Sequence, residues 1–158
     1  MKKIEVLGDL TDLVRPVIYL SSDLGEDALK KMADMFAPGD KGTLIVASMN
    51  NVDEKSIEWN HRAMDLSNFC TFWFADNRDA SISGGVMLAY NLGRTVGRYQ
   101  IGGGPDNVVV GVSPSSVAFD GLGWQINTQN IFLNGPWKVF KAKNKEIFVE
   151  HITDLLVK

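Results

Sequence analysis

Residues 59–74 read WNHRAMDLSNFCTFWF, and residues 75–85 continue with ADNRDASISGG. The part before Phe69 has the spacing of an amphipathic helix. The run Phe69–Phe74 is apolar almost throughout and rich in aromatic rings, which is typical of a strand in a sheet covered on both faces. The polar, glycine-rich stretch after it opens a second helix. Because ligands of open α/β sheets bind just beyond the carboxyl ends of the strands, this loop is the first place to look for chemistry.

Strand-like apolar runs alternate with helical patterns along the whole chain. Strands are expected at residues 3–7 on a sheet edge, 17–20, 43–47, 69–74, 107–112 and 137–141. Helices are expected at 24–36, from an N-cap at Asp53 to about Asp65, at 84–99, 122–132, and at 145–157 with Asn144 as cap. This order predicts one domain over residues 1–158 of the α/β class. We expect a Rossmann-like or flavodoxin-like three-layer sandwich with a mainly parallel sheet of four or five strands.

Composition and charge exclude several classes of protein. The chain is 45% apolar and 22% charged, its net charge is −3 and its basic residues are scattered, so we expect no nucleic-acid partner. No apolar run is long enough to span a membrane, and the start lacks the apolar core of a signal peptide. One cysteine, Cys70, lies in an apolar strand, so we expect a cytoplasmic protein without disulfides. His61 and His151 have no ligand spacing, so we expect neither a metal site nor a cofactor.

Glycine is used in two informative ways. The run at residues 101–106 precedes a strand, whereas a dinucleotide-binding loop follows a strand and opens a helix, so we reject a dinucleotide fingerprint. Within the predicted 84–99 helix, Gly85, Ala89, Gly93 and Gly97 form one stripe of small side chains. Glycine costs a helix about 1 kcal/mol relative to alanine, so the stripe indicates that another backbone packs close by. That backbone belongs either to this chain or to a second subunit.

Polar side chains gather at three predicted strand ends on one edge of the sheet. Short donors and acceptors of this kind suit a sugar or a ribose phosphate, and backbone N–H groups at a helix start can bind an anion. The structural alternatives are N-capping by Ser22 or Asp23 and solvation of the loops. The clusters are Ser21, Ser22 and Asp23; Ser48, Met49, Asn50 and Asn51; and Asp76, Asn77, Arg78, Asp79, Ser81 and Ser83.

Two residues of the helix before Phe69 stand out. Trp59 is expected either to pack into the core or to contact a ligand. Asp65 lies near the helix C-terminus, where the macrodipole disfavours an acid. We therefore expect Asp65 to be solvent-exposed or to have a specific polar partner.

Several pieces of sequence, in the same order, make the chain after Val17 resemble the nucleoside 2-deoxyribosyltransferase-like family. They are similar to its opening strand, its Trp-initiated helix, its aromatic strand, its Ser-x-Ser/Thr pair, its Glu-Leu-Gly-Arg motif and its Val-Gly-x-His-Pro segment with a following Asp and Gln. The matching pieces here are residues 17–22, 59–69, 72–74, 81–83, 91–94 and 108–114, with Asp120 and Gln125.

The resemblance implies an enzyme that breaks the N-glycosidic bond of a small-molecule nucleoside or nucleotide, as a homo-oligomer. The family's nucleophilic glutamate reads Asn91 here, and the glutamate after Trp59 reads Asn60. A carboxylate would then come from Asp79 or Asp76, with Asp65 or Asp23 as further alternatives, by the logic of retaining glycosidases. The expected catalytic residues are Asp79 and Asn91, and the expected substrate-binding residues are Ser21, Ser22, Asp23, Trp59, Asn60, Asp76, Ser81 and Ser83.

Two other hypotheses stay open. The amides in place of both acids favour a catalytically inactive protein that binds a nucleoside or nucleotide on the same scaffold. The small-residue stripe favours a structural or partner-binding subunit whose pocket is vestigial. The fold class by itself does not decide among the three.

Overall fold

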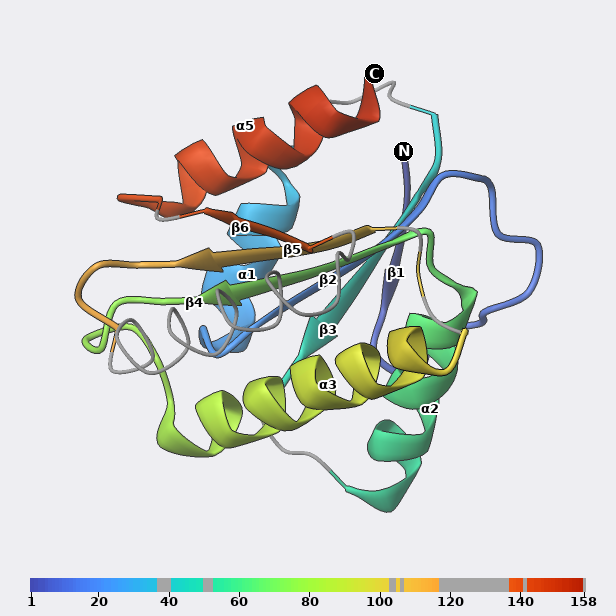
Figure 1. Ribbon diagram of the computed structural model, residues 1–158, viewed down its shortest axis with the longest axis horizontal. Helices are drawn as coiled ribbons and strands as arrows, with labels where there is room; N and C mark the ends of the chain where they lie inside the picture. Colours follow the sequence, from blue (N-terminus) through green and yellow to red (C-terminus); the bar gives the residue numbers. More distant parts are fainter. Residues whose placement is uncertain are drawn as a thin grey trace.

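Six strands form one all-parallel sheet in the order β1-β3-β2-β4-β5-β6, as Figure 1 shows. The computed structural model describes residues 1–36, 41–49, 53–102, 105, 107–116, 137–140 and 142–157, and only the backbone of 96, 99, 100 and 137–140. The strands are β1 (Lys2–Glu5), β2 (Val17–Ser22), β3 (Thr43–Ser48), β4 (Phe69–Phe74), β5 (Asn107–Val112) and β6 (Trp137–Phe140). The expected α/β class is confirmed. The sheet has six strands because both short edge candidates, β1 and β6, pair into it.

Two hydrophobic clusters cover the two faces of the sheet. Along β2, Val17 and Tyr19 pack on the face that also holds residues of α2 (Glu54–Leu66) and α3 (Ile82–Gln100). Ile18 and Leu20 pack on the opposite face, with residues of α1 (Glu26–Ala33) and α5 (Lys145–Leu156). In Figure 1, α5 lies on one side of the sheet, and α2 and α3 lie on the other. The sheet is therefore the middle layer of the predicted three-layer sandwich.

The chain changes direction within the sheet between β2 and β4. From β2 the chain passes through α1 to β3 on one side, and from β3 it passes through α2 to β4 on the other side of β2. The loops that leave β2 and β4 thus diverge to opposite faces of the sheet. Such a switch point opens a crevice at the carboxyl ends of the strands, where open α/β sheets bind ligands.

Helix caps follow the sequence in two cases and depart from it in one. Asp53 caps α2 through a capping box with Ser56, and Asn144 caps α5 by accepting from the Ile147 amide at 3.0 Å, as predicted. The predicted cap of α1 by Ser22 or Asp23 is wrong: α1 begins at Glu26 and its N-cap is Gly25, without a side-chain cap. The side chains of Ser22 and Asp23 bond elsewhere, as described below.

Other expectations meet the structure only in part. Met35 falls within the expected 24–36 helix, but it lies in the turn after α1 and is exposed. The expected helix at 122–132, together with Asp120, Gln125, Asn50 and Asn51, lies outside the described residues. In the part of the chain that the structure describes, no helix combines the length and apolarity needed to cross a bilayer.

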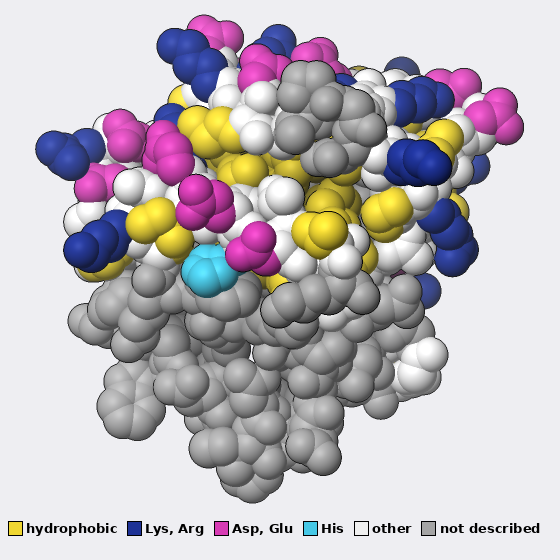
Figure 2. Space-filling view, turned by 90° about the horizontal axis from the view of Figure 1, so that it is seen from above, with side chains coloured by type: hydrophobic (Ala, Val, Ile, Leu, Met, Phe, Trp, Pro, Cys, Tyr) yellow, Lys and Arg dark blue, Asp and Glu magenta, His cyan; other side chains and the backbone are white. Residues whose placement is uncertain are grey.

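The charges of one face are mixed. Figure 2 looks onto the molecule from the α5 side and shows acidic and basic side chains interspersed among apolar ones. Several of the charges pair with one another, as in Lys30 with Glu26 and Glu5, and Lys3 with Asp34. Such exposed pairs contribute little to stability.

Candidate functional site

A cavity lies at the switch point, on the α3 side of the sheet. Its volume is about 550 Å³, and most of its wall is apolar. It lies between the end of β4, the loop that follows it and the first turns of α3. Its lining residues are Asp23, Phe74, Asn77, Ala80, Ser81, Ile82, Gly85, Val86, Ala89 and Ser116. We call it the apolar cavity.

Asp23 is the one carboxyl group among the described lining residues of the apolar cavity. It directly follows β2, is 4% exposed, and accepts a hydrogen bond through Oδ1 from the Ala75 amide at 2.8 Å. Burial raises the pKa of Asp23 to about 6, although the amide of Ala75, its own amide and the Ser22 hydroxyl lower it. A buried acid that titrates near neutrality beside a cavity marks a candidate functional group.

The loop after β4 is tied to the end of β2 by main-chain contacts. The Ser81 amide donates to the Asp23 carbonyl at 2.9 Å, and Leu24 and Ala80 form an isolated antiparallel bridge. At Gly84 a Cβ atom would lie 3.3 Å from Asp23 Cα and 2.4 Å from Ser81 Oγ. Glycine is therefore needed at Gly84, because α3 begins against the end of β2.

A second, polar cavity of about 300 Å³ lies on the α1 and α5 side of the same edge. Asp79, the predicted nucleophile, lines this cavity and not the apolar one. Asp76 also lines it and bonds to Arg78 and to the Ser115 hydroxyl. The bonds from Arg78, then that from Ser115, hold the pKa of Asp76 well below its usual range. Besides Asp76, Arg78 and Asp79, the charged or polar residues that line the polar cavity are Ser113, Lys143, Asn144, Lys145 and Glu146.

Ser21 and Ser22 are fully buried and use their hydroxyls within the sheet. Ser21 Oγ donates to the Thr71 carbonyl at 3.2 Å, and Ser22 Oγ donates to the Trp73 carbonyl at 2.8 Å. Ser22 Oγ also accepts from the Leu24 amide at 3.1 Å. The prediction that these hydroxyls bind substrate is not supported by this arrangement, because they stabilise the pairing of β2 with β4.

Asn91 and Asn60 lie inside the layer of helices rather than at the cavity. Asn91 is 2% exposed and its Nδ2 lies 3.2 Å from Met49 Sδ. Asn60 accepts from the Tyr19 hydroxyl at 2.7 Å and donates to the Ser56 carbonyl at 2.7 Å. Both amides satisfy buried partners, so neither is placed to contact a ligand in the apolar cavity.

Trp59 and Ser83 also stand apart from both cavities. Trp59 packs against the core on the α2 and α3 face, as one of its two expected roles predicted. Its Nε1 donates a hydrogen bond to the Gly8 carbonyl at 2.9 Å. Ser83 is exposed in the first turn of α3. Of the eight expected substrate-binding residues, the structure brings only Asp23 and Ser81 together at the apolar cavity, where Asn77 of the third polar cluster also lies.

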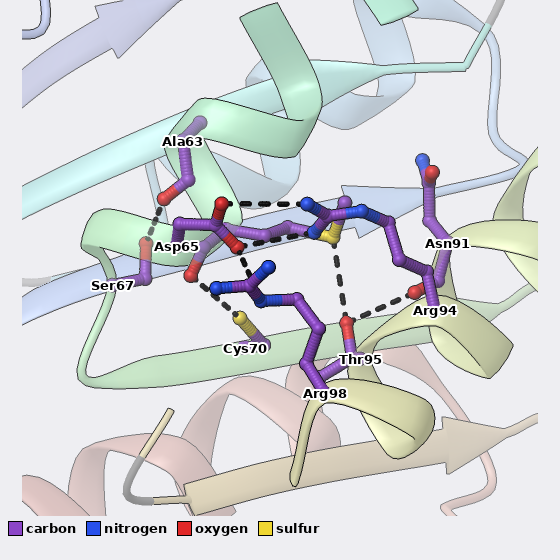
Figure 3. A network of polar contacts seen from close by, with 9 residues as sticks. Ala63, Asp65, Ser67, Cys70, Asn91, Arg94, Thr95 and Arg98 are labelled. Atoms are coloured by element: carbon purple, nitrogen blue, oxygen red, sulfur yellow. Dashed lines mark hydrogen bonds and ion pairs between the residues drawn. The ribbon is translucent and has the colours of Figure 1, made fainter. Parts of the chain in front are cut away.

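Asp65 has the specific polar partners that its position predicted. Its carboxylate pairs with Arg94 and lies 3.0 Å from Arg98 Nε, both on α3, and Figure 3 shows the two arginines converging on it. Nearby, the Thr95 hydroxyl donates to the Asn91 carbonyl at 2.9 Å. The Cys70 thiol is buried below, and burial raises its pKa, so it is an unreactive core residue.

The small-residue stripe of α3 is open at its C-terminal half. A Cβ atom at Gly93 or Gly97 would meet no atom within 4 Å. The interpretation that a backbone of this chain packs close to them is therefore wrong for the described residues. The subunit-interface interpretation stays a prediction.

Sequence reasoning missed the apolar wall formed by Phe74, Ile82, Val86 and Ala89. It also gave Asp23 a minor role. The alternation of side chains along β2 could have identified Asp23. Val17 and Tyr19 face the α3 side of the sheet, and every second residue after them, up to Asp23, is expected on that same side.

No known protein family and no curated protein matches this sequence. The resemblance to nucleoside 2-deoxyribosyltransferases therefore stays a prediction that rests on its motifs. Within the described ranges, no group of three or more His, Cys, Asp or Glu side chains could hold a metal ion.

Proposed function

We propose that this protein binds a nucleoside or nucleotide in the apolar cavity at the β2–β4 switch point. The cavity volume of about 550 Å³ falls within the range of about 300–1,000 Å³ typical of small-molecule sites. Phe74 and Val86 offer an apolar wall for a planar base, while Asp23, Asn77 and Ser81 offer polar groups. The resemblance noted above adds the nucleoside class to this proposal.

One observation favours binding over the chemistry implied by the resemblance. The apolar cavity holds Asp23 and Ser81, but Asp79 lines the other cavity and Asn91 is buried against Met49. The two predicted catalytic residues are thus separated from each other and from the apolar cavity. Retaining and inverting glycosidases both need a pair of carboxyl groups at the bond, and the described lining of the cavity supplies one.

Cleavage of the N-glycosidic bond is the second candidate, and Asp23 is the observation that favours it. A carboxyl group with a pKa of about 6 can donate a proton to a leaving base or accept one from water near neutral pH. In hydrolysis the bond from the anomeric carbon to the base nitrogen breaks, water supplies the new oxygen, and a proton goes to the base. Asp23 is the described side chain best placed for that proton transfer.

Binding is tested by titrating the protein with nucleosides and following the heat released. Val86→Trp should fill the cavity and abolish binding. Tyr90→Trp, one turn further along α3 and outside the cavity lining, is the matched control and should bind normally. If no purine or pyrimidine nucleoside or nucleotide in the panel gives a heat of binding, the proposal is wrong.

Catalysis is tested by chromatographic detection of free base with the same panel. Base release that is lost in Asp23→Asn and kept in Asp79→Ala supports the second candidate. If Asp79→Ala abolishes base release instead, the reaction takes place in the polar cavity, which Asp79 lines. If the protein binds nucleosides but releases no free base, only the binding function is supported.

We also propose a homo-oligomer in the cytoplasm, as the sequence predicts. The support for self-association is the exposed apolar face of α3, on which Ile82 is 91%, Val86 64% and Tyr90 57% exposed. The open Gly93 and Gly97 continue along the same helix and leave room for another backbone.

A further inference from the structure

The apolar cavity carries one acidic side chain, and no lysine or arginine is among its described lining residues. The basic residues near this edge are Arg78, which pairs with Asp76, and Lys143 and Lys145, and all three line the polar cavity instead. The two cavities flank the sheet edge on opposite faces. An anionic group in the apolar cavity would therefore meet a buried carboxylate with no described cation beside it.

The carboxylate of Asp23 turns one oxygen, Oδ2, toward the cavity. Oδ1 accepts from the Ala75 amide at 2.8 Å, and the Ser22 hydroxyl and the amide of Asp23 also interact with the carboxylate. Oδ2 lies toward α3, since a Cβ atom at Gly85 would be 3.7 Å from it, and Gly85 also lines the cavity. A ligand donor in the cavity can therefore form a charge-assisted hydrogen bond with Oδ2.

We infer that Asp23 selects the ligand of the apolar cavity: the site takes an unphosphorylated nucleoside that donates an N–H or O–H to Oδ2, and it rejects the nucleotide. This inference rests on the proposed function and narrows it. A donor can bond to the carboxylate oxygen that lies toward the cavity, and a charge-assisted hydrogen bond of this kind is about twice as strong as a neutral one. A phosphate brings like charge close to the same carboxylate, and juxtaposed like charges weaken binding.

The charge of Asp23, rather than the charge of a neighbouring residue, determines this selectivity. The charged residues on neighbouring elements are Glu26 and Asp27 of α1 and Asp76, Arg78 and Asp79 of the loop after β4. β3 and β4 carry no charged residue, and α3 carries none before Arg94. Burial and hydrogen bonds, rather than any of these charges, set the pKa of Asp23.

The test is calorimetric titration at pH 8 with a purine and a pyrimidine nucleoside, each with and without a 5′-phosphate. The wild-type protein should bind the nucleoside at least about tenfold more tightly than its monophosphate. In Asp23→Asn the nucleoside should bind more weakly and the gap should shrink below about threefold. Asp79→Asn removes one charge from the opposite face of the same edge and should leave the gap unchanged.

A second measurement covers the case in which Asp23→Asn does not fold. In the wild-type protein, a nucleoside 5′-sulfate keeps its charge between pH 8 and pH 5, so its penalty should shrink as Asp23 is protonated. A monophosphate that binds as tightly as the nucleoside at pH 8 overturns the inference and leaves the proposed function standing. A gap that persists in Asp23→Asn overturns the role of Asp23. Absence of binding by every nucleoside and nucleotide overturns the proposed function, and this inference with it.

Discussion

Asp65 at the end of α2 and Arg94 in α3 are joined by two hydrogen bonds, Nη1 to Oδ1 at 3.1 Å and Nη2 to Oδ2 at 3.3 Å. Paired donors on a planar guanidinium fix geometry as well as energy. The pair offsets the cost of an acid at the negative end of α2 and holds the two helices of this face together. It also shows why α3 carries cations in its second half.

The pair should contribute to stability because both groups are partly buried. Asp65→Asn should lower the free energy of unfolding by about 1 kcal/mol, since two guanidinium groups lose their carboxylate. Lys30→Met, which removes exposed pairs to Glu26 at 3.5 Å and to Glu5 at 3.8 Å, is the control and should change the free energy of unfolding by less than about 0.5 kcal/mol. Urea unfolding at low salt measures both, and equal effects of the two substitutions would contradict the prediction.

The titration of Asp23 should appear in the pH dependence of stability. Its folded-state pKa of about 6 lies above the model-compound value of 3.8, so the folded protein binds this proton more tightly than the unfolded chain. The resulting stabilisation is fully present below about pH 4 and is lost as the pH rises through 6, by up to about 3 kcal/mol. Asn cannot titrate, so Asp23→Asn should gain stability relative to wild type between pH 4 and pH 7. A difference in unfolding free energy that stays flat over this range would be the opposite result.

Two glycines should respond to alanine with opposite signs. At Gly111 a Cβ atom would lie 2.3 Å from Phe148 Cδ2 and 2.8 Å from Trp73 Cε3, two rings that stack at 5.2 Å. Gly111→Ala should therefore destabilise the protein by about 1–3 kcal/mol through overpacking. At Gly93 an added methyl group meets no atom of the same chain within 4 Å, so Gly93→Ala should stabilise α3 of the monomer by up to about 1 kcal/mol. Thermal unfolding of both variants decides, and a Gly111→Ala protein as stable as wild type would refute the packing argument.

Asn60 should matter for folding and not for ligand binding. Asn60→Leu leaves the fully buried Tyr19 hydroxyl without its acceptor, which should cost about 1–3 kcal/mol. Adding Tyr19→Phe should recover part of that loss, with a coupling of about 0.5–3 kcal/mol in a double-mutant cycle. Denaturant unfolding gives the cycle, and additive effects of the two changes would argue against the bond. Nucleoside affinity should be unchanged in the double variant if it folds.

Self-association through α3 should appear in the mass of the protein in solution. Light scattering should give a mass of at least two chains, and Gly93→Glu should lower it because a charged side chain would enter the open stripe. Glu26→Lys, on the opposite face of the sheet, is the control and should leave the mass unchanged. A monomer at all accessible concentrations would contradict the proposal.

Residue pattern alone predicted the fold well where one physical signal dominates. β4 and β5 have the predicted bounds because continuous apolar runs leave a buried parallel strand few alternatives. The caps Asp53 and Asn144 were predictable because a short polar side chain just before a helix can accept a hydrogen bond from a first-turn amide that has no partner within the helix. The helix α1 was predicted too long at both ends, since Leu24 and Phe36 are buried without being helical.

The site was less predictable because residue type does not say which partner a side chain will choose. Ser21, Ser22, Asn60 and Asn91 have the chemistry of ligand contacts, yet each satisfies a buried partner of the fold. Asp76 and Asp79 follow the same strand as the apolar cavity but line the other one. Only the three-dimensional divergence of the loops at the switch point separates these two groups.

The outer edge of the sheet has a consequence for behaviour at high concentration. β1 is four residues long, and Lys2, Lys3 and Glu5 are exposed on it while Ile4 is buried. Short edge strands with exposed charges discourage another chain from adding its own strand. The β1 edge therefore disfavours the addition of a strand from another molecule, which is the first step of cross-β aggregation at this side of the sheet.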